Sequence, residues 1–258
     1  MATVFKRAHH QKIHQVLHAL DASFLSQHQC YFGGGTAIVL RRGEYRESVD
    51  VDFLVSDIAA YRELRKQLQE PHVLEQLFGI GLGPLARVPE IRADQYGIRT
   101  LLPLANDGIK FEIVFEARIL FDAPGPDDQV AGVSTLTEID LAASKLLANV
   151  DRWADAGVFS RDIIDLAMLA LKEHEWHAAL AKAESAAGLE NIYIVTNTPP
   201  DLVEKRFVRD GLMHYMPRLF TPGQGKVEAL HQLASMNLSL PFAYVGDIAV
   251  SYTHLRAH

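Results

Sequence analysis

Three consecutive glycines at positions 33–35 restrict the fold of this chain more than any other feature. They follow a short apolar segment, 29–32, and precede a helix-compatible segment, 36–42. Consecutive glycines let the backbone turn sharply and approach a neighbouring group closely, and a helix that begins there directs its first N–H groups at an anion such as phosphate. The pattern therefore predicts a strand, a glycine turn and a helix, with an anion site at the turn.

A strand with one polar face follows the glycine turn. In the segment 49–55, Asp50 and Asp52 share one face, and valine and phenylalanine occupy the alternate positions. Two carboxylates on one side of a strand repel each other unless cations compensate them. Such a pair can hold two divalent cations about 3.5–4 Å apart, as in two-metal phosphoryl-transfer sites. We therefore predict that Asp50 and Asp52 bind metal.

A third carboxylate, Glu112, lies in a predicted hairpin. The segments 98–104 and 109–117 flank residues 106–108, Asn-Asp-Gly, which tolerate the positive φ of a tight turn. Within the second segment, Glu112 lies in mid-strand among apolar neighbours, where an unpaired acid is uncommon. We predict Glu112 as the third metal ligand.

The remaining pattern predicts two domains. Two prolines and a glycine at 123–128 indicate a linker, and little regular structure is expected at 71–89. The expected helices are 5–27, 57–70, 137–153, 161–174 and one that starts at Asp201, with no strand after the linker. The predicted fold class is α+β: a mixed sheet with flanking helices at 1–125, and then a mainly α-helical domain at 126–258.

Composition excludes several classes of protein. The chain has 25 basic and 32 acidic residues and a formal net charge of −7, which excludes a general polyanion-binding surface. A single cysteine, Cys30, excludes an intramolecular disulfide, and its apolar surroundings predict a buried, inert thiol. No apolar stretch approaches the roughly 20 residues of a membrane span, and the N-terminus lacks the apolar core of a signal peptide. We expect a cytoplasmic protein with no membrane partner.

Three histidines recur every four residues in the first predicted helix. This spacing of His10, His14 and His18 would suit zinc, but no carboxylate partner accompanies them in the sequence. We therefore expect a solvated helix face.

A basic cluster lies between the glycine turn and the two aspartates. It consists of Arg41, Arg42 and Arg46. Guanidinium groups there suit a triphosphate or an RNA backbone, but ordinary surface charge explains them equally well.

Two motifs resemble those of a known family. The segment 33–55, GGGTAIVLRRGEYRESVDVDFLV, is similar to the glycine-turn and DxD motifs of the DNA polymerase beta-like nucleotidyltransferases, and in detail to those of the AbiEii/AbiGii toxin family. Arg46 and Ser48 match that family's R-x-S step. Further on, KLLANVDR and RDIIDLAML resemble its helical signature, whose places are taken by Lys145, Arg152, Arg161, Asp162 and Asp165.

The resemblance implies a metal-dependent enzyme that moves a nucleoside monophosphate from an NTP to RNA, including tRNA, or to a protein. It also implies the toxin of a toxin–antitoxin pair, with a cognate antitoxin and with Mg²⁺ or Mn²⁺ at Asp50, Asp52 and Glu112. The implied nucleotide-binding residues are Gly34, Gly35, Thr36, Arg46, Ser48, Lys145 and Arg152. The implied catalytic residues are Asp50, Asp52, Glu112, Lys145, Asp162 and Asp165.

Two other functions stay open at this point. A catalytically silent relative would bind a nucleotide or a partner protein and release no pyrophosphate. An aminoglycoside-type enzyme would use the same metal pair on a small molecule. In addition, the helix dipole alone favours Asp162 near a predicted helix start, without any catalytic role.

Overall fold

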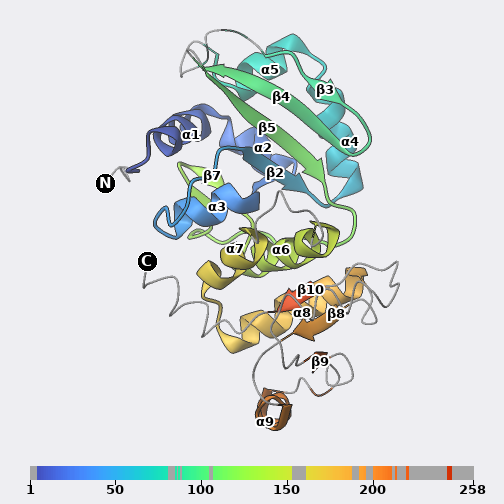
Figure 1. Ribbon diagram of the computed structural model, residues 1–258. Helices are drawn as coiled ribbons and strands as arrows, with labels where there is room; N and C mark the ends of the chain where they lie inside the picture. Colours follow the sequence, from blue (N-terminus) through green and yellow to red (C-terminus); the bar gives the residue numbers. More distant parts are fainter. Residues whose placement is uncertain are drawn as a thin grey trace. The chain divides into compact units, whose positions relative to one another are not determined.

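The structure is a computed structural model that describes residues 5–80, 85, 87, 89–104, 107–152, 161–187, 192–195, 200–210, 213, 219–220 and 243–245. The chain divides into two compact units, Met1–Leu141 and Ala142–His258, which are described separately (Figure 1). Compact units need not fold independently, so the domains expected at 1–125 and 126–258 stay a prediction. No helix in the described part of the chain is long and apolar enough to cross a membrane.

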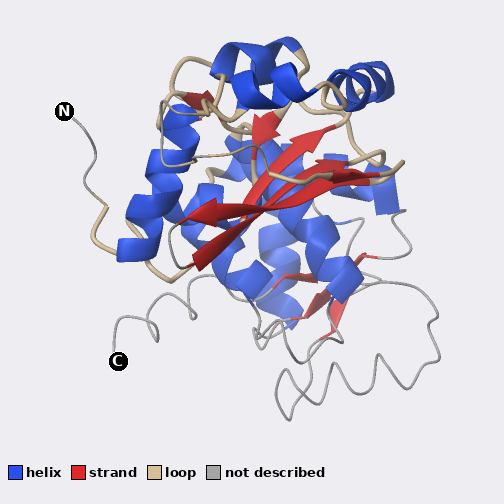
Figure 2. Cartoon of the chain, turned by 90° about the horizontal axis from the view of Figure 1, so that it is seen from above, coloured by secondary structure: helices blue, strands red, loops and turns tan. Residues whose placement is uncertain are grey.

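A mixed five-stranded sheet forms the centre of the first unit. Its strands are β1 (Tyr31–Phe32), β2 (Val51–Val55), β3 (Arg92–Ala93), β4 (Gly97–Leu104) and β5 (Asp107–Phe115), in the spatial order β1-β2-β5-β4-β3. Only the β2–β5 pair among these is parallel. Figure 2 shows the strands of this sheet in red, fanned by their twist, with helices in blue beside them. The predicted α+β fold with a mixed sheet is confirmed.

The two faces of the sheet differ in polarity. Phe53 and Phe111 are buried on one face, with their ring centroids 5.6 Å apart. Phe78 and Tyr61, from the helical segments that cover this face, place their rings 5.2 Å from Phe111 and Phe115 respectively. Because side chains alternate along a strand, Asp52 and its neighbours on the opposite face remain available for a polar site.

Five helices and a small hairpin complete the first unit. They are α1 (Ala8–Ala19), α2 (Ala22–Gln27), α3 (Gly34–Arg41), α4 (Ile58–Gln67), α5 (Pro71–Leu77), β6 (Gln129–Val130) and β7 (Val133–Ser134). Asp57 caps α4 as predicted, since it accepts the N–H of Ala60 at 2.7 Å. The next helix, α6 (Glu138–Arg152), begins in the first unit and continues into the second.

Two helix predictions in the first unit were wrong. The single helix expected at 5–27 is interrupted, because Asp21 accepts the N–H of Phe24 at 2.9 Å and starts a second helix there. The segment expected to be irregular contains α5, which begins with Pro71 at a position where a helix tolerates proline. The glycines and proline at 81–84 lie outside the described residues.

The predicted hairpin is present, and the segment expected to be a linker, 123–128, lies within the first unit. β4 and β5 pair antiparallel, and Leu104 lies opposite Asp107. Asp107 and Gly108, expected in the turn, belong to β5, and Asn106 lies outside the described residues. The segment 123–128 contains neither helix nor strand.

The second unit contains strands that the sequence did not predict. Its helices are the larger part of α6, α7 (Arg161–Leu169), α8 (Glu173–Ala187) and α9 (Pro200–Asp210). The strands β8 (Ile192–Val195), β9 (Leu219–Phe220) and β10 (Ala243–Val245) form a parallel sheet in the order β10-β8-β9. The prediction of no strand after the linker was therefore wrong. The run IYIV in β8 is rich in β-branched residues but is too short to show a period.

Candidate active site

The glycine turn packs directly against Asp52. Gly34, the first residue of α3, has a φ of +65°, in the left-handed region that favours glycine. A Cβ atom at this position would lie only 2.6 Å from Oδ2 of Asp52. In addition, the N–H of Gly33 donates a 2.8 Å hydrogen bond to the backbone carbonyl of Asp52. The turn and this acid can therefore lie in contact only because residue 34 has no side chain.

Two hydroxyl groups hold the backbone of Asp50. Thr36 donates its Oγ1 hydrogen to the Asp50 carbonyl at 2.6 Å. A hydroxyl has one proton to donate, so the 2.8 Å contact between Thr36 Oγ1 and Ser48 Oγ must be donated by Ser48. The hydroxyls of Thr36 and Ser48, which the resemblance assigns to the nucleotide, thus position the half-buried Asp50 in this structure.

The sheet register brings Glu112 beside Asp52. The two residues lie opposite each other in the parallel β2–β5 pair. The carboxylate of Glu112 accepts hydrogen bonds from Lys110 Nζ at 2.6 Å and from Arg99 Nε at 3.0 Å. Among the described residues, no group of three or more His, Cys, Asp or Glu side chains is arranged to hold a metal ion. The role of Glu112 as a metal ligand stays a prediction.

Lys110 supplies positive charge to this group of acids. Its hydrogen bond to Glu112 raises the pKa of Lys110 above the ordinary value, against the opposing effect of partial burial. The negative charges of Glu112, Asp50 and Asp52 raise this pKa further. Lys110 therefore stays positively charged and offsets part of the repulsion between the acids.

A basic groove of about 670 Å³ extends from Glu112 across β5, β4 and β3. Its charged lining consists of Arg87, Glu90, Arg92, Arg99, Lys110 and Glu112. Arg92 lies directly opposite Arg99 in the β3–β4 pair. Arg99 forms an ion pair with Asp94 at 3.1 Å, whereas neither Arg87 nor Arg92 forms one within the described part of the chain. Cationic charge is therefore concentrated in one groove of an acidic protein.

The sequence analysis did not select Arg99 or Lys110 as site residues. Lys110 shares a strand face with Glu112, so the alternation that identified Glu112 could also have identified Lys110. Arg99 is opposite Glu112 only because Leu104 pairs with Asp107 at the end of the hairpin. The turn that the sequence predicts at 106–108 would pair the two strands in a different register, so it could not have placed Arg99 opposite Glu112.

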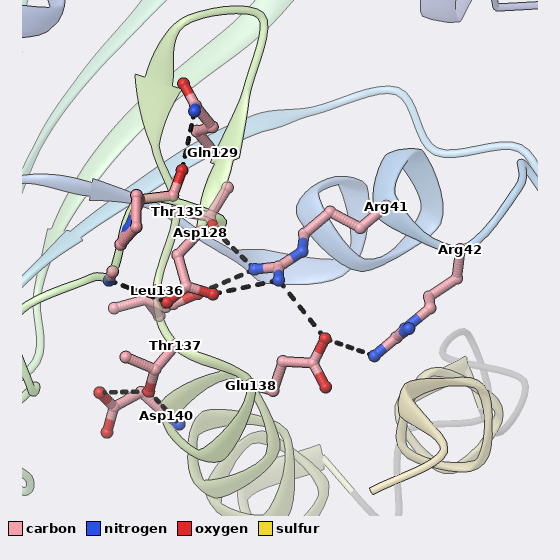
Figure 3. A network of polar contacts seen from close by, with 11 residues as sticks. Arg41, Arg42, Asp128, Gln129, Thr135, Leu136, Thr137, Glu138 and Asp140 are labelled. Carbon is pink, nitrogen blue, oxygen red and sulfur yellow. Dashed lines mark hydrogen bonds and ion pairs between the residues drawn. The ribbon is translucent and has the colours of Figure 1, made fainter. Parts of the chain in front are cut away.

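The predicted basic cluster is largely engaged in internal contacts. Figure 3 shows Arg41 reaching Thr135, the Leu136 carbonyl, Asp128 and Glu138, at 2.7, 3.3, 3.0 and 3.4 Å. Arg42 pairs with the same Glu138 carboxylate. These contacts engage both guanidinium groups, and Nε of Arg42 is buried with no hydrogen-bond partner among the described residues.

Arg46, the third member of the basic cluster, contacts its own loop. Its Nη1 donates to the carbonyl of Glu47 at 2.8 Å, and its guanidinium lies 5.9 Å from the centre of the Tyr45 ring. Its predicted contact with nucleotide is not tested by these interactions and stays a prediction.

A buried ion cluster lies in the second unit. Lys145, on α6, places its Nζ 2.9 Å from Oδ1 of Asp162 and 2.8 Å from Oδ2 of Asp165, both on α7. All three residues are buried. The structure thus brings together three of the five helical residues that the resemblance selects, and a fourth, Arg161, is the exposed first residue of α7. The side chain of Arg152 and the segment 153–160 lie outside the described residues.

A second network, which the sequence did not suggest, surrounds Glu44. Its carboxylate accepts the N–H groups of Lys6 at 2.7 Å and Arg7 at 3.1 Å, and it contacts Nδ1 of His10 at 2.8 Å. Burial alone would raise the pKa of Glu44, but these N–H groups and the His10 ring outweigh that effect and lower it.

The expectation of a solvated histidine face was wrong for His10. Its side chain is 0% exposed, whereas His14 is half-buried and His18 is exposed. The last two rings stack, and burial together with the charge of His18 lowers the pKa of His14. Cys30 is buried as expected, and burial raises the pKa of its thiol.

A comparison with protein families gives the assignment. Residues 15–217 match the family described as "Nucleotidyl transferase AbiEii toxin, Type IV TA system", a range that covers well over half of the chain. The chain belongs to this family. It is therefore a nucleotidyltransferase of the kind that acts as the toxin of a type IV toxin–antitoxin system. The AbiEii match includes every predicted site residue, from Gly34 to Asp165, whereas the network around His10 begins before it.

One solved structure is also similar, with 18% identity over 78% of this chain and 80% of that chain, and a TM-score of 0.42. Its title is "Crystal structure of putative nucleotidyltransferase from H. pylori". A likeness with so low a TM-score carries no argument. No curated protein matches the chain.

We expect Gly34→Ala to destabilise this AbiEii-family protein more than Gly43→Ala. Both glycines have positive φ, +65° and +77°, so alanine brings a similar backbone strain of about 1–2 kcal/mol at each. A Cβ at Gly43 would meet nothing within 4 Å, whereas one at Gly34 would collide with Asp52. Urea unfolding should show an excess loss of about 1–3 kcal/mol for Gly34→Ala. Equal losses would contradict the contact with Asp52.

Acid should remove the stabilisation that Glu44 provides. Its folded-state pKa lies below the ordinary value, so the stabilisation is complete above about pH 4.3 and is lost as the pH falls through the lowered pKa. We expect Glu44→Gln to be less stable than wild type at pH 7, by an amount that shrinks below about pH 4. Unfolding midpoints over a pH series measure this, with Glu75→Gln, on the exposed side of α5, as the control. A difference that is independent of pH would contradict the assignment.

Proposed function

We propose that the enzyme transfers a nucleoside monophosphate from an NTP to an acceptor, with divalent metal ions at Asp50 and Asp52. Family membership gives nucleotidyl transfer as the activity and an NTP as the substrate. The residues and the metal are our proposal. The observation that carries it is the contact between Gly34 and the Asp52 carboxylate, because it sets an anion-accepting helix start beside a metal-binding acid.

The oxygen donors of the two aspartates fit Mg²⁺ or Mn²⁺. In nucleotide sites Mg²⁺ is usually held by one or two carboxylates together with substrate phosphates. Two aspartates are therefore enough, although the described residues contain no group of three ligands. Bound ions would neutralise the phosphates during an in-line displacement. Glu112 is the proposed third ligand, since it lies opposite Asp52, and it would exchange its hydrogen bonds with Arg99 and Lys110 for that role.

The protein's own groups would orient the nucleotide. We propose that the turn at Gly34, Gly35 and Thr36 receives the triphosphate, since the first N–H groups of a helix point at bound anions. An acceptor hydroxyl then loses its proton to solvent as its oxygen bonds to the α-phosphorus. The bond between the α-phosphorus and the oxygen that bridges to the β-phosphate breaks, and pyrophosphate leaves. Ser48 contributes by fixing Thr36 and the Asp50 backbone.

The cluster in the second unit is proposed as a further part of the catalytic machinery. Burying Lys145, Asp162 and Asp165 is costly in desolvation, and charges buried at such a cost are concentrated at functional sites. Arg46 and Arg152 remain proposed contacts to the nucleotide.

We propose RNA as the acceptor, with its phosphates in the basic groove. Like charges directly opposite each other in a sheet are destabilising, so Arg92 and Arg99 favour an anion between or above them. Guanidinium groups match phosphate geometry. Tyr96, in the turn that leads into β4, is 64% exposed, and unpaired bases stack on aromatic side chains. Leu101, which lines the groove, adds an exposed apolar side chain. A protein acceptor is the alternative, and the toxin family implies a cognate antitoxin as a further partner.

Transfer to RNA is tested by incubating the protein with each α-labelled NTP, Mg²⁺ and total cellular RNA, followed by a denaturing gel. We expect wild type to label RNA and Asp52→Asn to label it about 10²–10³-fold less, the loss typical of a removed electrostatic contact to the transition state. Glu75→Gln is the control acid and should label like wild type. Full labelling by Asp52→Asn would refute the metal site, and label on a protein band alone would refute the RNA acceptor.

The groove is tested by Arg92→Ala. We expect a higher KM for RNA, an unchanged KM for the NTP and a salt dependence of RNA binding that is reduced by about one charge. Arg62→Ala, on the exposed side of α4, is the matched control. If both variants have the same KM for RNA, the groove does not hold the acceptor.

A further inference from the structure

We propose that His10 is a positioning residue that holds the segment carrying Asp50, by accepting the backbone N–H of Ser48. The proposal rests on the function proposed above for Asp50. It concerns a residue that precedes the range matched by the family. His10 lies on α1, yet both of its ring nitrogens contact the loop between α3 and β2.

The contacts of His10 fix its tautomer. The backbone N–H of Ser48 donates to Nε2 of His10 at 3.1 Å, so Nε2 is the acceptor and carries no hydrogen. The ring hydrogen is then on Nδ1, which donates to Oε1 of Glu44 at 2.8 Å. A fully buried ring with one acceptor and one donor thus has both satisfied by this loop.

The loop has a backbone that needs external support. Gly43 and Glu44 have φ values of +77° and +59°. The left-handed region is unfavourable for a residue with a side chain and persists where the surroundings hold it. Glu44 is held by its N–H bond to the Val39 carbonyl at 2.9 Å and by the N–H groups that precede α1. The start of α1 therefore fixes one end of the loop.

His9 and His10 hold the other end of the loop. Nε2 of His9 lies 3.0 Å from the carbonyl of Val49, which can only accept, so His9 donates. Val49 directly precedes Asp50, and Ser48 precedes Val49. His9 and His10 of α1 therefore hold Val49 and Ser48, the two residues that precede Asp50.

A chain of hydrogen bonds through Ser48 and Thr36 connects His10 to Asp50. Ser48, held at its N–H by His10, donates its hydroxyl to Thr36, and Thr36 donates its hydroxyl to the Asp50 carbonyl. Ser48 donates at both ends, through its N–H to His10 and through its hydroxyl to Thr36, and each hydroxyl has one proton to donate. If His10 no longer accepts the Ser48 N–H, Ser48 can move. Its movement would shift Thr36 and, through the Thr36 hydroxyl, the backbone of Asp50.

Two substitutions at His10 separate its two contacts. In His10→Gln the side-chain oxygen can reach the place of Nε2 and accept from Ser48. In His10→Asn the amide reaches only the place of Nδ1 and keeps the donor to Glu44. His14→Asn is the matched control, because it makes the same change one turn later on α1, where the ring contacts Phe5 and His18.

The experiment measures transfer per folded protein and hydrogen exchange of the Ser48 amide. We expect His10→Asn to lower kcat by about 10- to 100-fold, as a small misplacement of a reacting group does. It should also speed exchange at Ser48. His10→Gln should retain most of the kcat and of the protection, and His14→Asn should match wild type in both.

Three results would overturn the proposal. The first is His10→Asn with unchanged Ser48 exchange, and the second is faster exchange with unchanged kcat. The third is a loss of activity in all variants only in proportion to their unfolded fraction, which would make His10 merely structural. If wild type itself transfers nothing while Ser48 exchange responds to His10→Asn, the proposed function has failed and the contact is real but serves no transfer.

Discussion

A backbone turn in contact with a carboxylate is the constraint on which this site depends. Gly34 has to be left-handed and without a side chain for α3 to begin beside Asp52, and the Gly33 N–H fixes the same turn to the Asp52 carbonyl. The helix start and the acid are therefore parts of one rigid unit. A phosphate bound by the turn would lie next to the acid without any further movement of the chain, which is the kind of preorganisation that phosphoryl transfer needs.

The charge of the side chains on the polar face of the sheet changes from negative at β2 and β5 to positive at β4 and β3. Asp52, Glu112, Arg99 and Arg92 occupy one row across β2, β5, β4 and β3, so two acids are followed by two bases. Lys110 adds a positive charge beside the acids. We interpret the acidic end as the place of metal and nucleotide and the basic end as the place of the acceptor. In an acidic chain, such a local basic patch can attract a polyanion that the net charge of the chain would repel.

The sequence predicted those parts of the site that depend on neighbouring residues. The glycine turn is local and is present as expected. The strand expected at 49–55 begins only at Val51, so Asp52 lies in β2 and Asp50 directly precedes it. Partners distant in sequence were not predictable in this way. Arg99 meets Glu112 through the hairpin register, Arg41 meets Asp128 across the first unit, and His10 meets a carboxylate 34 residues away. A helical period groups His10 with the half-buried His14 and the exposed His18 but cannot show which polar group His10 contacts.

The central claim, that the aspartate pair beside the glycine turn holds metal and nucleotide together, is tested most directly by equilibrium binding of an NTP with and without Mn²⁺. Mn²⁺ binding can be followed by electron paramagnetic resonance in the same samples. The account predicts that wild type binds the NTP more tightly with Mn²⁺ than without it, and that the double variant Asp50→Asn with Asp52→Asn loses this difference while remaining folded. Equal strengthening by Mn²⁺ in wild type and in the double variant would contradict it.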